Sequence, residues 1–253
     1  MSQSSQRVAV VTGATSGIGE ATARKLVAEG IRVVGTGRNQ QKLTQLQAEL
    51  GTGFIGIAGD INDASIIDAL FATAHSHFGQ LPDIVVANAG RGLGGSVTET
   101  DVAEFNKVLQ LNVTSTLVLL QKAAQKMLQF QAQRYPHSAA DIIIIGSVVG
   151  RNISPFSAVY GASKFAVHAL AEGLRREVGP KGIRVSLVEP GLLLSGFQEA
   201  AGYSEVMVDM FKQNFGPLLI GDDIANTIHF MITQPPHVHI SEIMVRPTRQ
   251  DYP

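Results

Sequence analysis

Short, continuously apolar runs recur along this chain, and stretches with helical spacing separate them. The runs contain the β-branched and aliphatic residues of buried strands and lie at 7–12, 31–36, 54–58, 84–88, 141–146 and 183–188. Because they are hydrophobic throughout instead of alternating with polar residues, they are typical of a parallel sheet that helices cover on both faces. This pattern restricts the chain to the α/β architectures.

Between the runs lie segments with helical spacing and helix-ending residues. We predict helices that end at Gly30, at Gly79 and before Gly179-Pro180, and helices that span about 101–130 and 157–178. Parallel strands joined by right-handed crossover helices form a doubly wound sheet. No linker composition interrupts the pattern, so we predict a single domain over 1–253.

Composition excludes several classes of function. Lys and Arg number 20 against 21 Asp and Glu, with a net charge of -1 and no basic stripe, so neither a nucleic acid nor a membrane surface is an expected partner. The chain has no Cys, which excludes disulfides, Cys-ligated metals and a thiolate nucleophile. Its histidines are scattered, with close pairs only at 75/77 and 237/239, so packing or solvated roles are expected and no metal site is predicted.

No targeting segment is recognisable in the sequence. Residues 1–7 are polar and contain no apolar signal-peptide core, and the longest aliphatic stretch, 142–145, is far too short to span a bilayer. A cytoplasmic location is therefore expected.

The first predicted strand leads directly into TGATSGIG at 12–19, which opens the first predicted helix. Glycines at 13, 17 and 19 permit a sharp turn and let the backbone approach a phosphate with no Cβ in between. The helix N-terminus then offers unpaired N–H groups and a partial positive charge. A plain structural turn is the alternative, but the position directly after the first strand favours a dinucleotide pyrophosphate site.

The end of the second predicted strand carries Gly37 and Arg38, where NAD-binding folds place an acidic residue for the ribose. A carboxylate would repel a 2′-phosphate, whereas a guanidinium binds one with a planar pair of donors. The sequence therefore favours NADP(H), with a solvated surface residue as the alternative for Arg38. Asp60, after the third predicted strand, is expected either at the adenine edge or as a helix cap.

Tyr160 and Lys164 stand four residues apart at the start of a predicted helix, so they share one helix face. A free phenol has a pKa of about 10, and we expect the Lys164 ammonium to lower the pKa of Tyr160 toward the working range. Ser147 ends the fifth predicted strand, and its hydroxyl can bind the same substrate oxygen. A Tyr-x3-Lys pattern by itself also arises by chance, so its meaning depends on the other motifs.

Further polar residues follow two other strands or interrupt a helix. Asn88-Ala89-Gly90 follows the fourth predicted strand, and Pro190-Gly191 follows the sixth, where backbone groups can face a nicotinamide. Asn112 lies among apolar residues of the long predicted helix, although Asn is unfavourable inside a helix. We therefore expect Asn112 to have a purpose, such as holding a water.

The motifs occur in one order: TGATSGIG at 12–19, ANAG at 87–90, LNV at 111–113, GS at 146–147, YGASK at 160–164 and EPG at 189–191. In this order and spacing they resemble the short-chain dehydrogenase/reductase family over essentially the whole chain. The resemblance implies an α/β fold with a single Rossmann-type parallel sheet and helices on both faces. It also implies an NADP(H)-dependent oxidoreductase that acts on a small-molecule carbonyl or alcohol.

The same resemblance implies a role for each motif residue. Tyr160 would exchange a proton with the carbonyl or alcohol oxygen, Lys164 would lower its pKa and bind the nicotinamide ribose, and Ser147 would position that oxygen. Asn112 would anchor a water in a proton relay through Lys164. The expected cofactor contacts are Gly13, Thr15, Ser16, Gly17, Ile18, Gly19, Arg38, Asp60, Ile61, Asn88, Ala89, Gly90, Val113, Tyr160, Lys164, Pro190, Gly191 and Ser195.

The chain departs from the family pattern at several positions. Ala87 stands where a second Asn is common, Gly146 where a second Ser is common, and Ser115 where Gly is common. Ser195 occupies the usual Thr position after the EPG motif, and Ser16 lacks the extra basic residue of some NADP-dependent members. None of these changes removes a catalytic group.

The C-terminal stretch 234–250 is similar to family members that act on serine and other 3-hydroxy acids with NADP, and it is expected to form a strand and its flank. By resemblance, the helices near 101–130 and 157–179 would form subunit contacts in a homodimer or homotetramer. Packing on the sheet explains their apolar positions equally well.

The segment 191–217 breaks the alternation of strands and helices and mixes glycines with apolar residues such as Leu192, Phe197 and Phe211. Because parallel sheets bind ligands at the carboxyl ends of their strands, we predict a mobile substrate lid here. An ordinary surface helix packed on the core is the alternative. The apolar residues favour a hydrophobic or aromatic ketone, in conflict with the hydroxy-acid likeness of the C-terminal stretch.

Two hypotheses for the function follow. The first is a carbonyl reductase or alcohol dehydrogenase that uses NADP(H). The second is a catalytically silent NADP(H)-binding sensor or scaffold on the same fold. The intact set of Asn112, Ser147, Tyr160 and Lys164 favours the enzyme, because a binding protein has no need of a phenol beside an ammonium.

Overall fold

The structure, a computed structural model, describes residues 6–153, 157–196 and 201–252. Within these residues seven strands form one sheet in the order β3-β2-β1-β4-β5-β6-β7, and all neighbouring strands are parallel. The strands are β1 (Val8–Thr12), β2 (Arg32–Gly37), β3 (Phe54–Ala58), β4 (Ile84–Ala87), β5 (Ala140–Ile145), β6 (Ile183–Pro190) and β7 (Glu242–Val245). The predicted doubly wound α/β fold is confirmed, and β7 comes from the C-terminal stretch.

The helices of the described residues are α1 (Gly17–Ala28), α2 (Gln40–Leu50), α3 (Ala64–Phe78), α4 (Val102–Leu109), α5 (Ser115–Leu128), α6 (Gln131–Arg134), α7 (Ala158–Val178), α9 (Glu205–Phe215) and α10 (Gly221–Ile232). The long helix predicted over 101–130 is interrupted, because a π-helical turn at Gln110–Thr114 separates α4 from α5. The helices α2, α6 and α10 lie outside the predicted set; α2 buries only Leu43 and Leu46, so its apolar pattern is weak. No helix in this part of the chain is long and apolar enough to cross a membrane.

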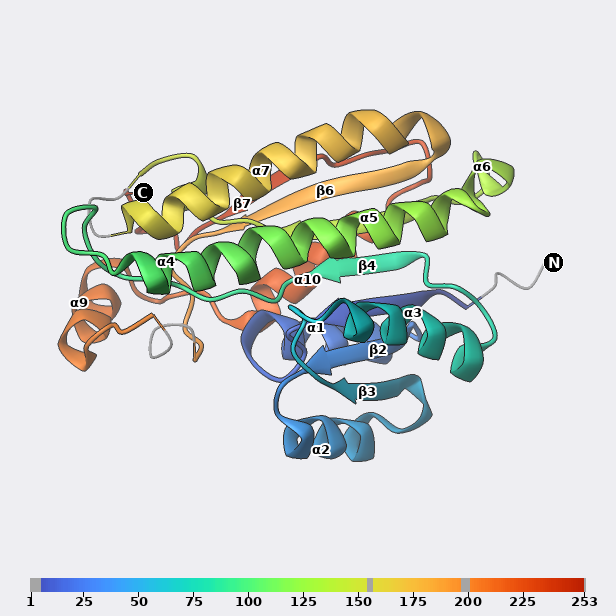
Figure 1. Cartoon of the computed structure of the whole chain (residues 1–253), viewed down its shortest axis with the longest axis horizontal. Coiled ribbons are helices and arrows are strands. Elements are labelled where there is room, and N and C mark those ends of the chain that lie inside the picture. Colours follow the sequence, from blue (N-terminus) through green and yellow to red (C-terminus); the bar gives the residue numbers. More distant parts are fainter. Residues whose placement is uncertain (1–5, 154–156, 197–200, 253) are drawn as a thin grey trace.

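Helices cover both faces of the sheet (Figure 1). On β1, Val8 and Val10 face the core shared with α3, α5 and α7, whereas Ala9 and Val11 face the core shared with α1, α2 and α10. All four side chains are fully buried. This burial on both faces is the reason that the strand sequences show no polar alternation.

The chain changes direction across the sheet at β1. The strands β2 and β3 lie on one side of β1, and β4 to β7 lie on the other. The connections therefore diverge at the carboxyl ends of β1 and β4, which is where open parallel sheets bind their ligands. The TGATSGIG turn follows β1 and the ANAG motif follows β4, so both border this crevice.

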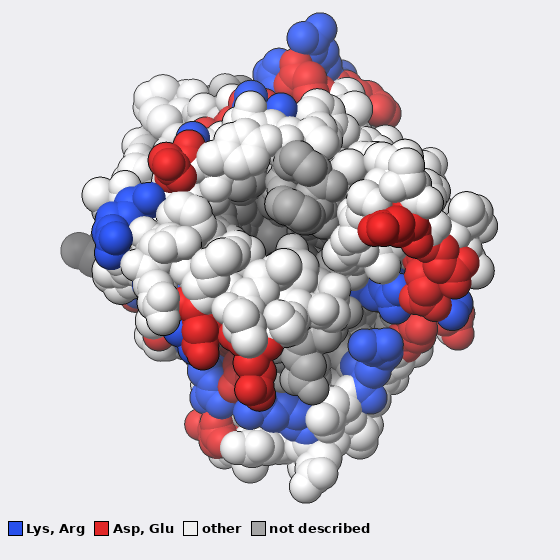
Figure 2. Space-filling model, turned by 90° about the vertical axis from the view of Figure 1, so that its left-hand side faces the viewer, with Lys and Arg blue, Asp and Glu red and all other residues white. Residues whose placement is uncertain are grey.

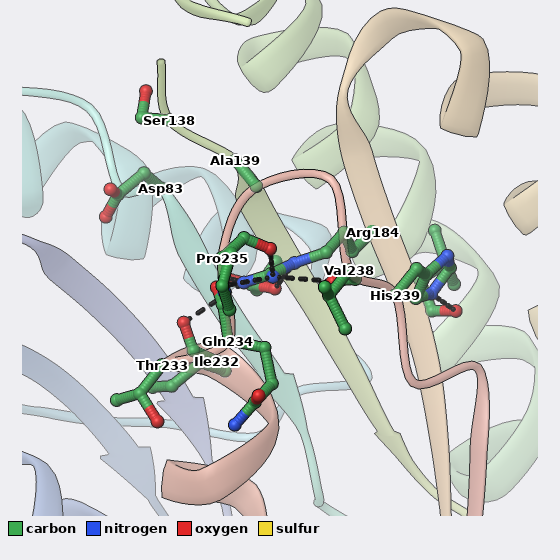
Figure 3. A network of polar contacts seen from close by, with 12 residues as sticks. Asp83, Ser138, Ala139, Arg184, Ile232, Thr233, Gln234, Pro235, Val238 and His239 are labelled. Carbon is green, nitrogen blue, oxygen red and sulfur yellow. Dashed lines mark hydrogen bonds and ion pairs between the residues drawn. The ribbon is translucent and has the colours of Figure 1, made fainter. Parts of the chain in front are cut away.

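At the opposite, amino ends of the strands, a buried polar network ties β5 and β6 to the loop after α10 (Figure 3). Arg184 on β6 donates to both carboxylate oxygens of Asp141 on β5, at 2.7 and 3.0 Å. Arg7 donates to the same carboxylate at 2.6 Å. Arg184 also donates to the backbone carbonyl oxygens of Ile232, Gln234, Pro235 and Val238.

We expect the Arg184→Met substitution to lower the free energy of unfolding by about 3 kcal/mol, because it removes one partner of a buried ion pair and the donor of several buried carbonyl groups. Denaturation by urea measures this loss. Arg176→Met is the matched control: the Arg176 side chain is 74% exposed in its ion pair with Glu172, so its change should stay within about 0.5 kcal/mol. Equal losses for the two variants would contradict the importance of the network.

Candidate active site

A cavity of about 390 Å³ opens at the carboxyl ends of the strands. Figure 2 shows a hollow on this side of the molecule, bordered mostly by uncharged side chains, with the charged groups farther out. The predicted site residues that line the cavity are Gly13, Thr15, Ser16, Gly17, Ile18, Arg38, Asp60, Ile61, Asn88, Ala89, Gly90, Ser147, Tyr160, Lys164, Pro190, Gly191 and Ser195. Gly19, Asn112 and Val113 are not among the lining residues; Val113 packs against the hydrophobic core, and Leu111 lines the cavity instead.

Hydrogen bonds join the glycine turn after β1 to the end of β4. The Thr12 hydroxyl accepts from the backbone N–H groups of Asn88 and Ala89, both at 3.0 Å. The Asn88 side-chain amide donates to the Thr12 carbonyl oxygen at 2.9 Å. Two segments 76 residues apart in the sequence are thereby held side by side.

Close contacts require the glycines of this turn. Gly13 and Gly17 have φ angles of +68° and +52°, a region that favours glycine. A Cβ on Gly13 would lie 2.7 Å from the amide nitrogen of Asn88, and a Cβ on Gly19 would lie 2.1 Å from the Gly13 carbonyl oxygen. Gly19 therefore supports the turn from within and does not itself face the cavity.

The N-terminus of α1 opens onto the cavity. Ser16 occupies the N-cap position, but its side chain makes no capping hydrogen bond. Ser16, Gly17 and Ile18 all line the cavity. A helix N-terminus of this kind offers backbone N–H groups and a partial positive charge to an anion, so the turn fits a pyrophosphate.

The end of β2 lies beside the glycine turn and carries Arg38 to the cavity. A Cβ on Gly37 would lie 2.6 Å from Cγ2 of Thr15, so the two segments are in direct contact. Arg38 is exposed and lines the cavity, where its guanidinium can meet an anionic group of a ligand.

Asp60 and Ile61 follow β3 and also line the cavity. The Asp60 carboxylate accepts from the backbone N–H of Asn62 at 2.9 Å in a short turn. The N-cap of α3 is Asp63, whose carboxylate accepts from the Ser65 N–H. The helix-capping alternative for Asp60 is therefore wrong, while its place at an adenine edge stays a prediction.

Three predicted catalytic groups meet in the cavity from α7 and from the turn after β5. Tyr160 and Ser147 both line the cavity, and the Ser147 hydroxyl is close enough to act on the Tyr160 phenol. The Lys164 ammonium lies 5.7 Å from the centre of the Tyr160 ring and donates to the Ile145 carbonyl oxygen at 2.8 Å. Tyr160 and Lys164 are both buried, with 8% and 7% of their surface exposed.

Burial dominates the electrostatics of this group. It raises the pKa of the Tyr160 phenol above its ordinary value, the nearby Tyr203 raises it further, and the hydrogen bond with Ser147 acts in the opposite direction. Burial also lowers the pKa of Lys164 to about 8. The expected net lowering of the Tyr160 pKa is not seen in this structure, because burial of the enclosed phenol outweighs the neighbouring ammonium, which donates to a backbone carbonyl. At neutral pH Tyr160 is a neutral phenol that can donate a proton.

Asn112 is buried in the π-helical turn. Its side-chain oxygen accepts from the Arg91 N–H at 3.0 Å, and its amide nitrogen donates to the Arg91 carbonyl at 3.0 Å and to the Ser163 hydroxyl at 3.1 Å. Both amide hydrogens are therefore used, and a water held by this side chain would need the second lone pair of the oxygen. The Ser163 hydroxyl in turn donates to the Tyr160 carbonyl oxygen at 2.7 Å. Asn112 therefore connects the loop after β4 to α7.

The predicted lid at 191–217 borders the cavity. A Cβ on Gly17 would lie 3.2 Å from Cβ of Ser195, so the start of this segment lies against the glycine turn. The helix α9 within the segment has no buried residue, which argues against the alternative of a surface helix packed on the core. Phe197 lies outside the described residues.

Arg91, Tyr203 and Gln250 also line the cavity, although they are not among the predicted site residues. Arg91 directly follows the ANAG motif, and this adjacency is a signal that could have identified it. The Gln250 side chain accepts from the Leu192 N–H at 2.8 Å across 58 residues of sequence. No local pattern indicates a contact over that separation.

We expect Gly19→Ala to weaken binding of a dinucleotide and to lower the free energy of unfolding by about 1–3 kcal/mol, because its methyl group would collide with the Gly13 carbonyl. Isothermal titration calorimetry and denaturation measure the two effects. Gly173→Ala on α7 is the control, since a Cβ there meets nothing within 4 Å. Unchanged binding in Gly19→Ala would contradict the tight turn described above.

Comparisons with known proteins agree with this geometry. A family model described as short chain dehydrogenase matches residues 7–205. An uncharacterized oxidoreductase of Staphylococcus epidermidis is 33% identical over 247 residues, which cover 98% of this chain and 100% of that protein. A closed form of serine dehydrogenase complexed with NADP+ superimposes with a TM-score of 0.87 and 27% identity, over 97% of this chain and 96% of that chain. A 3-ketoacyl-(acyl-carrier-protein) reductase from Brucella melitensis complexed with NADH has a TM-score of 0.86 and 25% identity, over 96% and 98% of the two chains.

Proposed function

The chain belongs to the short-chain dehydrogenase family of oxidoreductases, and from this premise we propose that it transfers a hydride between NADP(H) and a carbonyl or secondary alcohol. Tyr160 is the proton donor and acceptor of this reaction. The observation that carries the proposal is the juxtaposition of Tyr160, Ser147 and Lys164 inside a cavity at the carboxyl ends of the strands.

The residues around the cavity fit a dinucleotide. The glycine turn and the N-terminus of α1 would hold the pyrophosphate, because Gly13 and Gly17 line the cavity and Ser16 does not cap the helix. Arg38 would hold the 2′-phosphate, and Asn88 to Gly90, which also line the cavity, would contact the cofactor. The likeness to a serine dehydrogenase complexed with NADP+ supports NADP(H) as the cofactor. Because the similar reductase is complexed with NADH, the preference for one cofactor over the other depends on Arg38. When bound, NADP(H) supplies or accepts the hydride.

In the direction of reduction, the carbonyl carbon gains a hydride and the carbonyl oxygen gains the Tyr160 proton. The neutral phenol that burial maintains is suited to this donation. Ser147 donates a second hydrogen bond to the same oxygen, and the Lys164 cation offsets the negative charge that Tyr160 acquires. Asn112 holds α7 against the loop after β4. Its side-chain oxygen would also accept a hydrogen bond from a water that returns the proton through Lys164.

We assign the substrate to the uncharged, apolar ketones. The substrate side of the cavity is lined by Val148, Val149, Leu192 and the phenol of Tyr203. These side chains offer contact area and hydrogen bonding to a carbonyl compound, and the segment 191–217 closes over it as a lid. A 3-hydroxy acid, the substrate class suggested by the serine dehydrogenase likeness, is the competing assignment.

A homodimer or homotetramer remains our expectation for the assembly. Leu117 and Leu128 on α5 and Phe165 on α7 are exposed apolar residues on the outer surface of these helices. A second copy of the chain would cover them.

A catalytically silent NADP(H) sensor on the same fold is the second hypothesis. It accounts for the glycine turn and Arg38, but it gives no role to a buried phenol beside a serine and a lysine. Turnover separates the two hypotheses, because both predict cofactor binding.

We expect Tyr160→Phe to reduce kcat about 100- to 10,000-fold, because the proton donor is lost, and to leave NADPH affinity nearly unchanged. NADPH oxidation against ketones, aldehydes and 3-oxo acids measures turnover, and calorimetry measures binding. Tyr135→Phe, on the exposed Tyr135 outside the cavity, serves as the matched control. Undiminished turnover in Tyr160→Phe would refute the acid/base role.

We expect Arg38→Ala to weaken NADPH binding about 10- to 100-fold, through loss of a charge-assisted hydrogen bond to the 2′-phosphate, while NADH binding changes little. Dissociation constants for both cofactors test this, with Arg38→Lys as a variant that restores part of the NADPH affinity. Parallel losses for NADPH and NADH would show that Arg38 does not recognise the 2′-phosphate.

A further inference from the structure

The catalytic Ser147 lies in a turn whose two glycines leave space for one histidine ring. A Cβ on Gly146 would lie 2.4 Å from Nε2 of His168, and a Cβ on Gly150 would lie 2.3 Å from its Cε1. His168 is on α7, one helical turn after Lys164. The imidazole therefore fills a notch under the turn, at a place where the family often carries a second serine on the turn itself.

The ring also binds the turn. The backbone N–H of Ser147 donates to Nε2 of His168 at 3.4 Å, a long hydrogen bond between the two elements. Because this nitrogen accepts, the imidazole is neutral and carries its proton on Nδ1. Inside the turn, the Ser147 hydroxyl accepts from the Val149 N–H at 3.4 Å.

Burial and the neighbouring charges keep the imidazole of His168 neutral. Burial, together with the cations Lys164 and Arg151, lowers the pKa of His168 to about 4, while Glu242 acts in the opposite direction. Arg151 is itself bound to the buried Glu189 at 2.6 Å and to Glu242. The acceptor on Nε2 is therefore available throughout the neutral range.

We propose that His168 is a positioning residue that fixes the Ser147 turn, so that the Ser147 hydroxyl stays in register with Tyr160 and the substrate oxygen. The inference rests on the proposed role of Ser147 in the reaction. His168 is not among the residues that line the cavity, so it acts on the substrate only through Ser147. The tight fit against Gly146 and Gly150 prevents the turn from moving toward α7.

The test is a double-mutant cycle of Ser147→Ala and His168→Leu, with His168→Gln as a variant that restores a hydrogen-bond acceptor. We expect His168→Leu to lower kcat about 10- to 100-fold by displacing Ser147, with the NADPH dissociation constant and the melting temperature close to wild type. His168→Gln should recover most of the loss. In the double variant His168→Leu should add little to Ser147→Ala, because both act through one hydroxyl.

The outcomes separate the inference from the proposed function. If the losses in kcat of the two single variants multiply in the double variant, the ring only packs against the turn and the positioning role is overturned. The same conclusion follows if His168→Leu and His168→Gln lose equal activity. A large loss in Ser147→Ala beside wild-type turnover in His168→Leu would overturn the inference and leave the proposed function intact. Wild-type turnover in Ser147→Ala would remove the role of Ser147 and the inference with it, while loss of activity in Tyr160→Phe would still support the enzyme.

Discussion

The hydrogen bonds between Thr12 and Asn88 join the carboxyl ends of β1 and β4, and the rest of the site depends on this junction. It fixes the glycine turn against the ANAG loop at the point where the sheet reverses its strand order. Asn112 donates to the backbone of Arg91, which follows the ANAG motif, and to the Ser163 hydroxyl on α7. Ser163 in turn donates to the Tyr160 carbonyl oxygen. The proposed cofactor and catalytic halves of the cavity are therefore linked through these hydrogen bonds and the short backbone segment from Asn88 to Arg91.

The polar network at the other end of the sheet complements this junction. Arg184 and Asp141 bind β6 to β5 where the strands begin, and the carbonyl groups of the loop after α10 surround the same guanidinium. With the amino ends fixed in this way, the carboxyl ends can carry loops that serve ligand binding instead of stability. Tyr160 lies at this carboxyl end of the sheet, where its enclosed site raises its pKa and keeps the phenol protonated.

The sequence predicts the sheet well because the inner strands are buried on both faces, so residues such as Val8 to Val11 give an unbroken apolar signal. It also predicts which motifs meet, since glycine turns and strand ends of a parallel sheet gather at one edge. It does not predict contacts between distant segments, such as Gln250 with Leu192 or His168 with Ser147. Nor does the spacing of Tyr160 and Lys164 reveal their pKa values, because burial outweighs the charge of the neighbouring group.

The most direct test of the account is to follow the transferred hydrogen itself. The wild-type protein is incubated with NADPH that carries deuterium at the transferable position, together with apolar ketones, aldehydes and 3-oxo acids, and the products are analysed by mass spectrometry. We predict an alcohol with deuterium on the former carbonyl carbon, formed most readily from an apolar ketone. Tight NADPH binding without a deuterated product from any of these carbonyl classes would contradict the proposed hydride transfer and support the silent sensor.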